Sequence, residues 1–218
     1  VLATASLDTN LLMLGTAEGA AIGDFDGEGK TELCHGDKFG NIHFFEFDNN
    51  KFTKEYTYKL SPSDGPNYIC RLDLEGDGKY EVLVMNSTSS PLYKNGNGSE
   101  RIWKASIFKS IGVNRYEVIW EEYFYDVREG VIGNLGFSYK NGVSAGNIDN
   151  QPGDEIIIST FPNLYIFKYD VATNKVKPLW WYPSAFANSA LVYDFDGNGI
   201  NDIGFGTFAD TRFFEYDG

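Results

Sequence analysis

Side chains that commonly build reactive centres are scarce in this sequence of 218 residues, which contains two cysteines and two histidines. Cys34 and Cys70 have neither a C-x-x-C spacing nor a Cys/His partner spacing, so no zinc site is predicted. The two thiols are either free and buried or joined in one disulfide bond, and both alternatives stay open. His35 and His43 lie in apolar runs, where ordinary packing is expected. No G-x-S-x-G, H-E-x-x-H or phosphate-loop motif is present, and no catalytic residue is predicted.

Basic residues are also few, because 18 Lys and Arg stand against 31 Asp and Glu and give a formal net charge of −13. No basic patch indicates a nucleic-acid partner. No basic amphipathic segment or apolar run of about 20 residues predicts membrane binding or insertion. No signal peptide is seen, and the abrupt start at Val1 leads us to expect a mature or excised segment of a longer protein.

Aromatic residues and glycine, by contrast, are abundant. Aromatic side chains make up 16% of the chain, and 24 glycines separate runs rich in Tyr, Phe, Val and Ile. This composition is typical of strands joined by tight turns. No segment has a convincing helical period, N-cap or pattern of charge pairs. The sequence therefore predicts an all-β protein.

One acidic stretch, Asp194-Phe-Asp-Gly-Asn-Gly-Ile-Asn-Asp202, places oxygen-bearing side chains at positions 1, 3, 5 and 9. Two interleaved glycines argue against a plain strand, because glycine readily adopts the positive φ angles of a tight loop. Such a loop turns its carboxylates toward one another, and they repel unless a cation lies among them. Carboxylate and amide oxygens without Cys or His select a hard cation, Ca²⁺ before Mg²⁺.

The same pattern occurs three more times, in 24–32, 73–81 and 147–155. The four starting positions are 49, 74 and 47 residues apart. A repeat of about 40–50 residues is typical of propeller blades and solenoid units. The sequence therefore predicts four copies of one structural unit, with a polar insertion at 87–100 explaining the long second spacing.

The acidity of the chain is concentrated in these loops. Positions 1, 3, 5 and 9 hold four, four, two and three carboxylates in the four loops, thirteen in all, which equals the net negative charge. The rest of the chain is formally neutral. The negative charge is therefore interpreted as belonging to metal sites and not to a solvating surface.

Each loop is followed at once by an apolar strand, whereas an EF-hand loop of twelve residues leads into a helix. The side chain at position 7 varies, so this position is expected to contribute only its backbone carbonyl, from Lys30, Lys79, Gly153 and Ile200. The motif D-x-D-G-x-G-x-x-D/E before a strand resembles the FG-GAP/VCBS repeat family, the calcium loops of integrin-α-like β-propellers. The resemblance covers four repeats and nearly the whole chain.

The resemblance implies Ca²⁺ ligands at positions 1, 3, 5 and 9. These are Asp24, Asp26, Glu28 and Glu32; Asp73, Glu75, Asp77 and Glu81; Asn147, Asp149, Gln151 and Glu155; and Asp194, Asp196, Asn198 and Asp202. Three or four ions are expected. The third loop departs most from the family pattern, because Pro152 replaces a glycine and only two ligands are carboxylates.

The resemblance further implies a single β-propeller domain over 1–218, built from four-stranded antiparallel blades. The expected blades are 16–60, 64–126, 140–183 and 187–218. The fourth is one strand short, and residues 1–15 are expected either to supply the closing strand or to belong to a longer array. Family propellers commonly have seven blades, so the chain is either complete or part of a larger propeller.

The expected function is a non-catalytic, calcium-stabilised module of a secreted or cell-surface protein, used for binding, adhesion or surface assembly. Millimolar extracellular Ca²⁺ suits exposed loops of this kind. A protein or carbohydrate ligand is expected on the loop surface, since binding residues concentrate on loops held by rigid scaffolds. The ions themselves are expected to have a purely structural role.

Two other functions stay open. The first is a carbohydrate-active propeller resembling a polysaccharide lyase, or a lectin-like module, for which Trp180-Trp181-Tyr182 offers either a sugar-stacking platform or ordinary packing between blades. Against a lyase, the arginines are scattered along the chain. The second is self-assembly, in which residues 1–15 close onto a neighbouring subunit.

Overall fold

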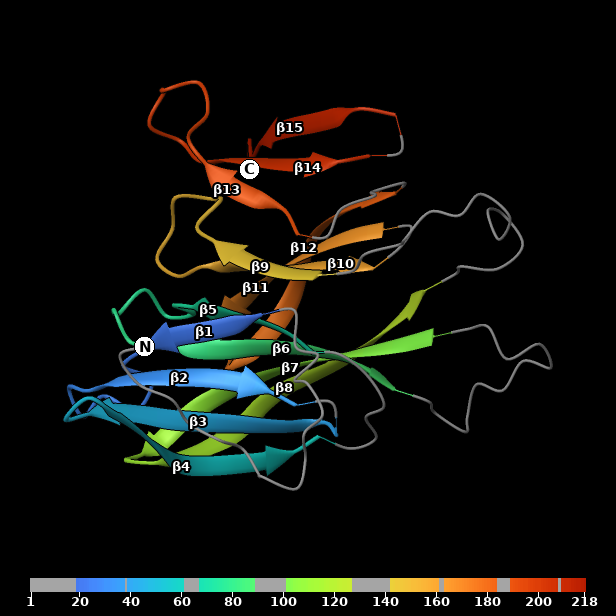
Figure 1. The fold of residues 1–218 in the computed structure, drawn as a ribbon. Helices are drawn as coiled ribbons and strands as arrows, with labels where there is room; N and C mark the ends of the chain where they lie inside the picture. The colour runs from blue at the N-terminus through green and yellow to red at the C-terminus, as the bar shows by residue number, and fades with distance from the viewer. Residues whose placement is uncertain are drawn as a thin grey trace. The chain divides into compact units, whose positions relative to one another are not determined.

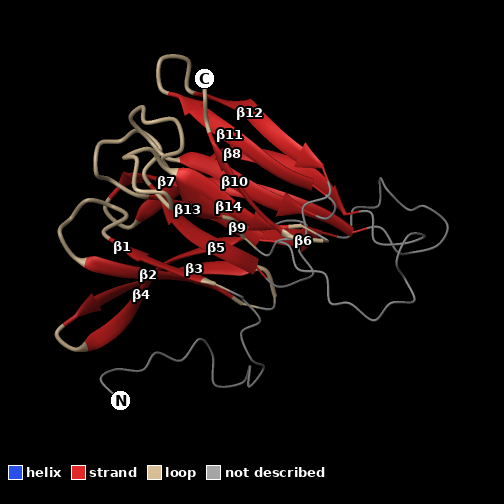
Figure 2. Ribbon diagram, turned by 90° about the horizontal axis from the view of Figure 1, so that it is seen from above, coloured by secondary structure: helices blue, strands red, loops and turns tan. Residues whose placement is uncertain are grey.

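A computed structural model describes residues 19–37, 39–60, 67–88, 101–126, 142–160, 163–183, 189–207 and 209–218. These ranges contain strands, turns and loops and no helix (Figure 2). In the same ranges, therefore, no helix is long and apolar enough to cross a membrane. The predicted all-β class is confirmed for the part of the chain that the structure describes.

The strands form four sheets, and in each sheet neighbouring strands follow one another in the sequence (Figure 1). The first sheet contains β1 (Ala20–Gly23), β2 (Thr31–Gly36), β3 (Asn41–Asp48) and β4 (Lys51–Lys59), and the second contains β5 (Asn67–Leu72), β6 (Glu81–Thr88), β7 (Arg101–Gly112) and β8 (Arg115–Asp126). The third contains β9 (Gly142–Gly146), β10 (Glu155–Thr160), β11 (Asn163–Asp170) and β12 (Lys175–Pro183), and the fourth contains β13 (Leu191–Tyr193), β14 (Asp202–Gly206) and β15 (Thr211–Glu215). This antiparallel meander is the predicted blade architecture.

The turns explain why the strands fold back on themselves. Asp48 pairs with Lys51 across the turn between β3 and β4, so Asn49 and Asn50 form a two-residue loop. Both have positive φ, 49° and 60°. Two positive φ angles match the type I′ turn, whose twist agrees with that of the flanking strands, and Asn tolerates this conformation better than most residues.

The described residues divide into two compact units, each with its own core. The first unit contains the described parts of 19–71, 79–88 and 104–122, and the second contains those of 72–78, 101–103 and 123–218. In the first unit Phe44 is fully buried and stacks on Tyr116 at 3.9 Å between ring centroids. In the second unit Ile157 and Phe205 lie in the core, and Trp180 and Tyr182 pack against it.

Several sequence predictions concern segments outside these ranges. The predicted closing strand at residues 1–15 and positions 89–100 of the predicted insertion lie outside the described residues. The start of the insertion shifts, because β6 continues through Thr88. Both cysteines are described and no disulfide bond joins them, so the disulfide alternative is wrong. Cys34 is fully buried, as the other alternative expected, and Cys70 is half-buried.

Candidate metal sites in the strand-connecting loops

Each acidic stretch connects the first two strands of its sheet, and its ninth residue belongs to the second of these strands. Glu81, Glu155 and Asp202 are the first residues of β6, β10 and β14, and Glu32 is the second residue of β2. A strand therefore follows every loop, as the sequence predicts. Because strands are rigid, the strand fixes the backbone position of the residue at position 9.

The first, second and fourth loops share one backbone turn, which the carboxylate at position 1 organises. In the first loop Gly27 N–H donates to Asp24 Oδ1 at 2.8 Å, and Gly29 N–H donates to Asp24 Oδ2 at 2.9 Å. Asp73 and Asp194 accept the equivalent pairs at 2.7 and 2.9 Å and at 2.7 and 2.8 Å.

Both glycines of each turn have positive φ, from 69° to 89°. This conformation is open to glycine at little cost and strains other residues. The glycines that interrupt the acidic pattern are therefore required by the turn itself.

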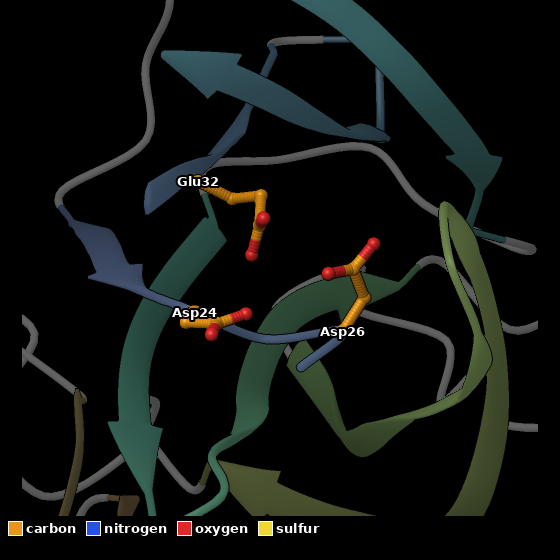
Figure 3. A group of neighbouring side chains, drawn as sticks. All are labelled: Asp24, Asp26 and Glu32. Atoms are coloured by element: carbon orange, nitrogen blue, oxygen red, sulfur yellow. The ribbon is translucent and has the colours of Figure 1, made fainter. Parts of the chain in front are cut away.

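Three carboxylates converge in the first loop. One oxygen from each of Asp24, Asp26 and Glu32 lies within 4.8 Å of the others. Figure 3 shows the three side chains pointing into the same space, Glu32 from β2 and the two aspartates from the loop after β1. Like charges at this separation repel, so a cation among them would stabilise the folded loop.

Glu32 shows how well this arrangement fits a cation. Its side chain is buried, and Oε2 accepts the Phe25 N–H at 2.5 Å. Oε1 is buried and has no hydrogen-bond partner. Burial, followed by the nearby charges of Asp26 and Asp24, raises the pKa of the Glu32 carboxyl to about 7. A buried carboxylate oxygen without a partner is costly, and a hard cation would satisfy it.

The fourth loop repeats this geometry. Asp194, Asp196 and Asp202 each place one carboxylate oxygen within 4.8 Å of the other two. Asp202 is buried, and its Oδ2 accepts the Phe195 N–H at 3.0 Å, as Glu32 does for Phe25. The structure therefore brings together the predicted ligands at positions 1, 3 and 9 in both loops.

In both loops the predicted ligand at position 5 also contacts a residue of its own loop or of the neighbouring strand. In the first loop Lys30 Nζ contacts Glu28 Oε1 at 3.1 Å and Glu46 Oε1 at 2.7 Å. In the fourth loop Asn198 Nδ2 donates to Glu215 Oε2 at 2.5 Å and in addition to Asp196 Oδ2 at 3.3 Å. Glu46 pairs with Glu32 across β2 and β3, and Glu215 pairs with Asp202 across β14 and β15. Sequence reasoning missed these two glutamates, because only the strand register places them beside the loops.

The second loop is described by its turn alone. Asp73, Glu75 and Asp77 belong to the second unit and Glu81 to the first, so their side chains are not treated as one site. Within the second unit this loop contacts the third loop through two reciprocal hydrogen bonds. Asp154 N–H donates to Asp73 O at 2.7 Å, and Asp73 N–H donates to Asp154 Oδ2 at 2.9 Å.

The third loop follows a different path. Its positive φ angles are at Asn150, 57°, and Gly153, 95°, which are positions 4 and 7. The other loops have them at positions 4 and 6, and here position 6 is Pro152, whose ring fixes φ near −65°. Asn147 uses its Nδ2 to donate to Gln151 O at 2.5 Å. Lys168 Nζ on β11 contacts Asp149 Oδ2 at 2.6 Å and Glu155 Oε1 at 2.8 Å.

His43 and two residues of the aromatic run are placed as packing predicts. His43 is buried, and its Nε2 lies 3.2 Å from Asp37 Oδ2. Trp180 and Tyr182 pack against the second core, whereas Trp181 is 56% exposed. Side chains of successive strand residues point to opposite faces, and the middle residue of the run is its most exposed member.

Comparison with known proteins identifies similar folds but does not identify the function. No family model and no curated protein matches the chain. Among solved structures, the rhamnogalacturonan lyase PL11 of Bacillus licheniformis matches 88% of this chain with a TM-score of 0.57 at 18% identity. The exotype rhamnogalacturonan lyase YesX matches 88% with a TM-score of 0.55 at 18% identity. The chain spans 40% and 38% of those two structures, and at this identity the likeness concerns the fold alone.

Proposed function

We propose that this chain is a calcium-stabilised, non-catalytic binding module of a secreted or cell-surface protein, with Ca²⁺ bound in the first and fourth loops. The observation that carries the proposal is the buried Glu32 carboxyl group, whose Oε1 has no hydrogen-bond partner and which places one oxygen within 4.8 Å of oxygens of Asp24 and Asp26. The fourth loop repeats the same turn and the same cluster. A scaffold whose loops are held rigid by bound metal would suit adhesion or surface assembly.

Calcium suits these clusters better than other ions. Each offers three carboxylates and no sulfur or imidazole, which favours a hard cation. The ligands come from a short irregular loop, and Ca²⁺ accepts irregular shells of six to eight oxygens, whereas Mg²⁺ requires a near-ideal octahedron. Backbone carbonyls at Lys30 and Ile200 and water would complete the shell. The ion would be structural, joining a loop to the strand that follows it.

Calorimetric titration of the metal-free protein with CaCl₂ tests the proposal. Asp26→Asn removes one charge from the first cluster and keeps the side chain's size. We expect it to weaken one binding step at least tenfold, and Asp196→Asn to weaken the other. Asp48→Asn is the matched control, since Asp48 is exposed at the end of β3, outside both clusters. Titration curves for Asp26→Asn and Asp196→Asn that match the wild type would contradict calcium binding in these loops.

Carbohydrate binding is a second candidate function, supported by one aromatic hollow. Tyr165 on β11 pairs with the exposed Trp181 on β12, and together with Phe167 and Pro178 they line a hollow of about 550 Å³. The exposed Trp181 ring, with the half-buried rings of Tyr165 and Phe167 beside it, suits the apolar face of a sugar. Two of the solved structures that share this fold are rhamnogalacturonan lyases, which makes rhamnogalacturonan a reasonable probe.

Affinity electrophoresis in gels containing soluble rhamnogalacturonan tests whether Trp181 binds the polysaccharide or is exposed without binding it. We expect the polysaccharide to retard the wild-type protein, and Trp181→Ala to abolish most of the retardation. Tyr193→Ala is the control, because Tyr193 is 65% exposed and does not line the hollow. Equal mobility of wild type and Trp181→Ala would remove the support for this surface.

A further inference from the structure

We propose that the third loop contains its own cation, the Lys168 ammonium, in the place that Ca²⁺ takes in the first and fourth loops. The third loop would therefore fold without metal. The comparison with Ca²⁺ rests on the proposed function of the other two loops. The contacts of Lys168 themselves do not depend on it.

The contacts of Lys168 match those expected of a bound cation. Its Nζ joins Asp149 at position 3 and Glu155 at position 9, at 2.6 and 2.8 Å. Glu155 is fully buried, and its other oxygen, Oε2, accepts the Ile148 N–H at 2.6 Å. Glu32 in the first loop has the equivalent backbone contact, but its remaining oxygen has no hydrogen-bond partner. Lys168 Nζ therefore contacts the second carboxylate oxygen of Glu155, whereas the second carboxylate oxygen of Glu32 has no hydrogen-bond partner.

The strand register explains why this ammonium lies beside the third loop and not beside the first or the fourth. The residue that faces position 9 on the next strand is Glu46 in the first sheet and Glu215 in the fourth. In the third sheet Ile156 pairs with Phe167, and the next position along β11 is Lys168. One cross-strand position thus carries a negative charge in the first and fourth sheets and a positive charge in the third.

The charge balance also distinguishes the third loop from the loops proposed to bind Ca²⁺. The fourth loop and its cross-strand residue contribute the carboxylates of Asp194, Asp196, Asp202 and Glu215, whereas the corresponding set in the third loop is Asp149 and Glu155 with one ammonium. A divalent ion entering the third loop would have to displace or repel Lys168. Asn147 Oδ1 has no hydrogen-bond partner there, but it is a neutral oxygen and adds no charge.

The backbone of the third loop agrees with this reading. Pro152 prevents the positive φ that position 6 has in the other loops, and Asn147 donates to Gln151 O instead of supplying a carboxylate at position 1. The loop therefore has one carboxylate fewer than the calcium candidates and a different turn, and Lys168 holds its two carboxylates together. Among the first, third and fourth loops, the cross-strand residue distinguishes the loop that has an ammonium from the two that are proposed to take a metal.

The test combines thermal melts with a count of bound Ca²⁺ per chain after dialysis against 1 mM CaCl₂. Lys168→Met keeps the length of the side chain and removes its charge. In chelator we expect it to melt roughly 5–10 °C below the wild type, because Asp149 and Glu155 lose their partner. In CaCl₂ we expect it to bind one ion more than the wild type and to regain part of the loss. Lys177→Met is the control, because Lys177 forms an exposed ion pair with Asp170.

A second variant keeps the proposal testable if Lys168→Met does not fold. Asp149→Asn in the wild-type background should leave the number of bound Ca²⁺ unchanged, because no ion is expected in that loop. Loss of one ion with Asp149→Asn would overturn the proposal, as would a Lys168→Met protein with unchanged melting temperature and calcium count. If the wild type binds no Ca²⁺, the proposed function fails, and the melt of Lys168→Met in chelator still decides whether Lys168 acts as the cation of its loop.

Discussion

Removing Ca²⁺ is expected to lower the melting temperature of this protein by roughly 10–20 °C. A ligand that binds only the folded state stabilises it by about 2.7 kcal/mol when its free concentration is 100 times the dissociation constant. Two such sites give about 5 kcal/mol, and each kcal/mol moves the melting temperature of a chain of this size by about 2–4 °C. The measurement is a pair of melts, in excess EGTA and in millimolar CaCl₂.

The division into two compact units allows the calcium-dependent shift of the melting temperature to be assigned to each loop separately. The first loop belongs to the first unit and the fourth loop to the second. If the melt shows two transitions, Asp26→Asn should remove the calcium-dependent shift from one of them and Asp196→Asn from the other. MgCl₂ in place of CaCl₂ is the control, and it should restore much less. Equal melting temperatures in EGTA and CaCl₂ would show that the loops fold without metal.

The second large effect is expected at Phe25, the residue at position 2 of the first loop. Phe25 is buried, and its ring packs edge-on against Phe44 at 6.0 Å between centroids. Phe25→Ala should cost about 3–5 kcal/mol of unfolding free energy, since it leaves a cavity in the first core. Urea unfolding followed by circular dichroism measures this cost.

The fourth loop supplies a matched comparison for that variant. Phe195 has the same position in its loop and the same backbone contact to position 9, but 44% of it is exposed. We expect Phe195→Ala to cost less than half as much as Phe25→Ala. Equal losses would mean that the ring acts through the shared turn and not through the core beneath the first loop.

Glycine placement made the loops predictable from the sequence. Gly27 and Gly29 have φ of 78° and 89°, and Gly197 and Gly199 have the same two values. Few residues other than glycine adopt such angles readily, so the spacing of glycine and acid reports the turn directly. The blade architecture followed from the apolar strand after each loop and from short turns such as Asn49-Asn50. The family resemblance itself stays a prediction.

The partners of the loops could not be predicted in the same way. Glu46, Lys168 and Glu215 lie 14, 13 and 13 residues beyond position 9 of their loops, and only the register of two strands brings them there. Register depends on turn length and on which face is buried, and no local pattern states it. The same limit applies to the contacts of Glu28 with Glu46 and of Asn198 with Glu215, which no local pattern predicts.

A calcium count is the most direct measurement of the central claim. The protein is dialysed against CaCl₂ at the dissociation constant found by titration of the wild type, and bound metal per chain is determined for the wild type and for the double variant Asp26→Asn/Asp196→Asn. The proposed sites predict that the double variant retains only a small part of the calcium that the wild type binds. A wild-type protein that retains no calcium, or a double variant that retains as many ions as the wild type, would contradict the assignment of these two loops as calcium sites.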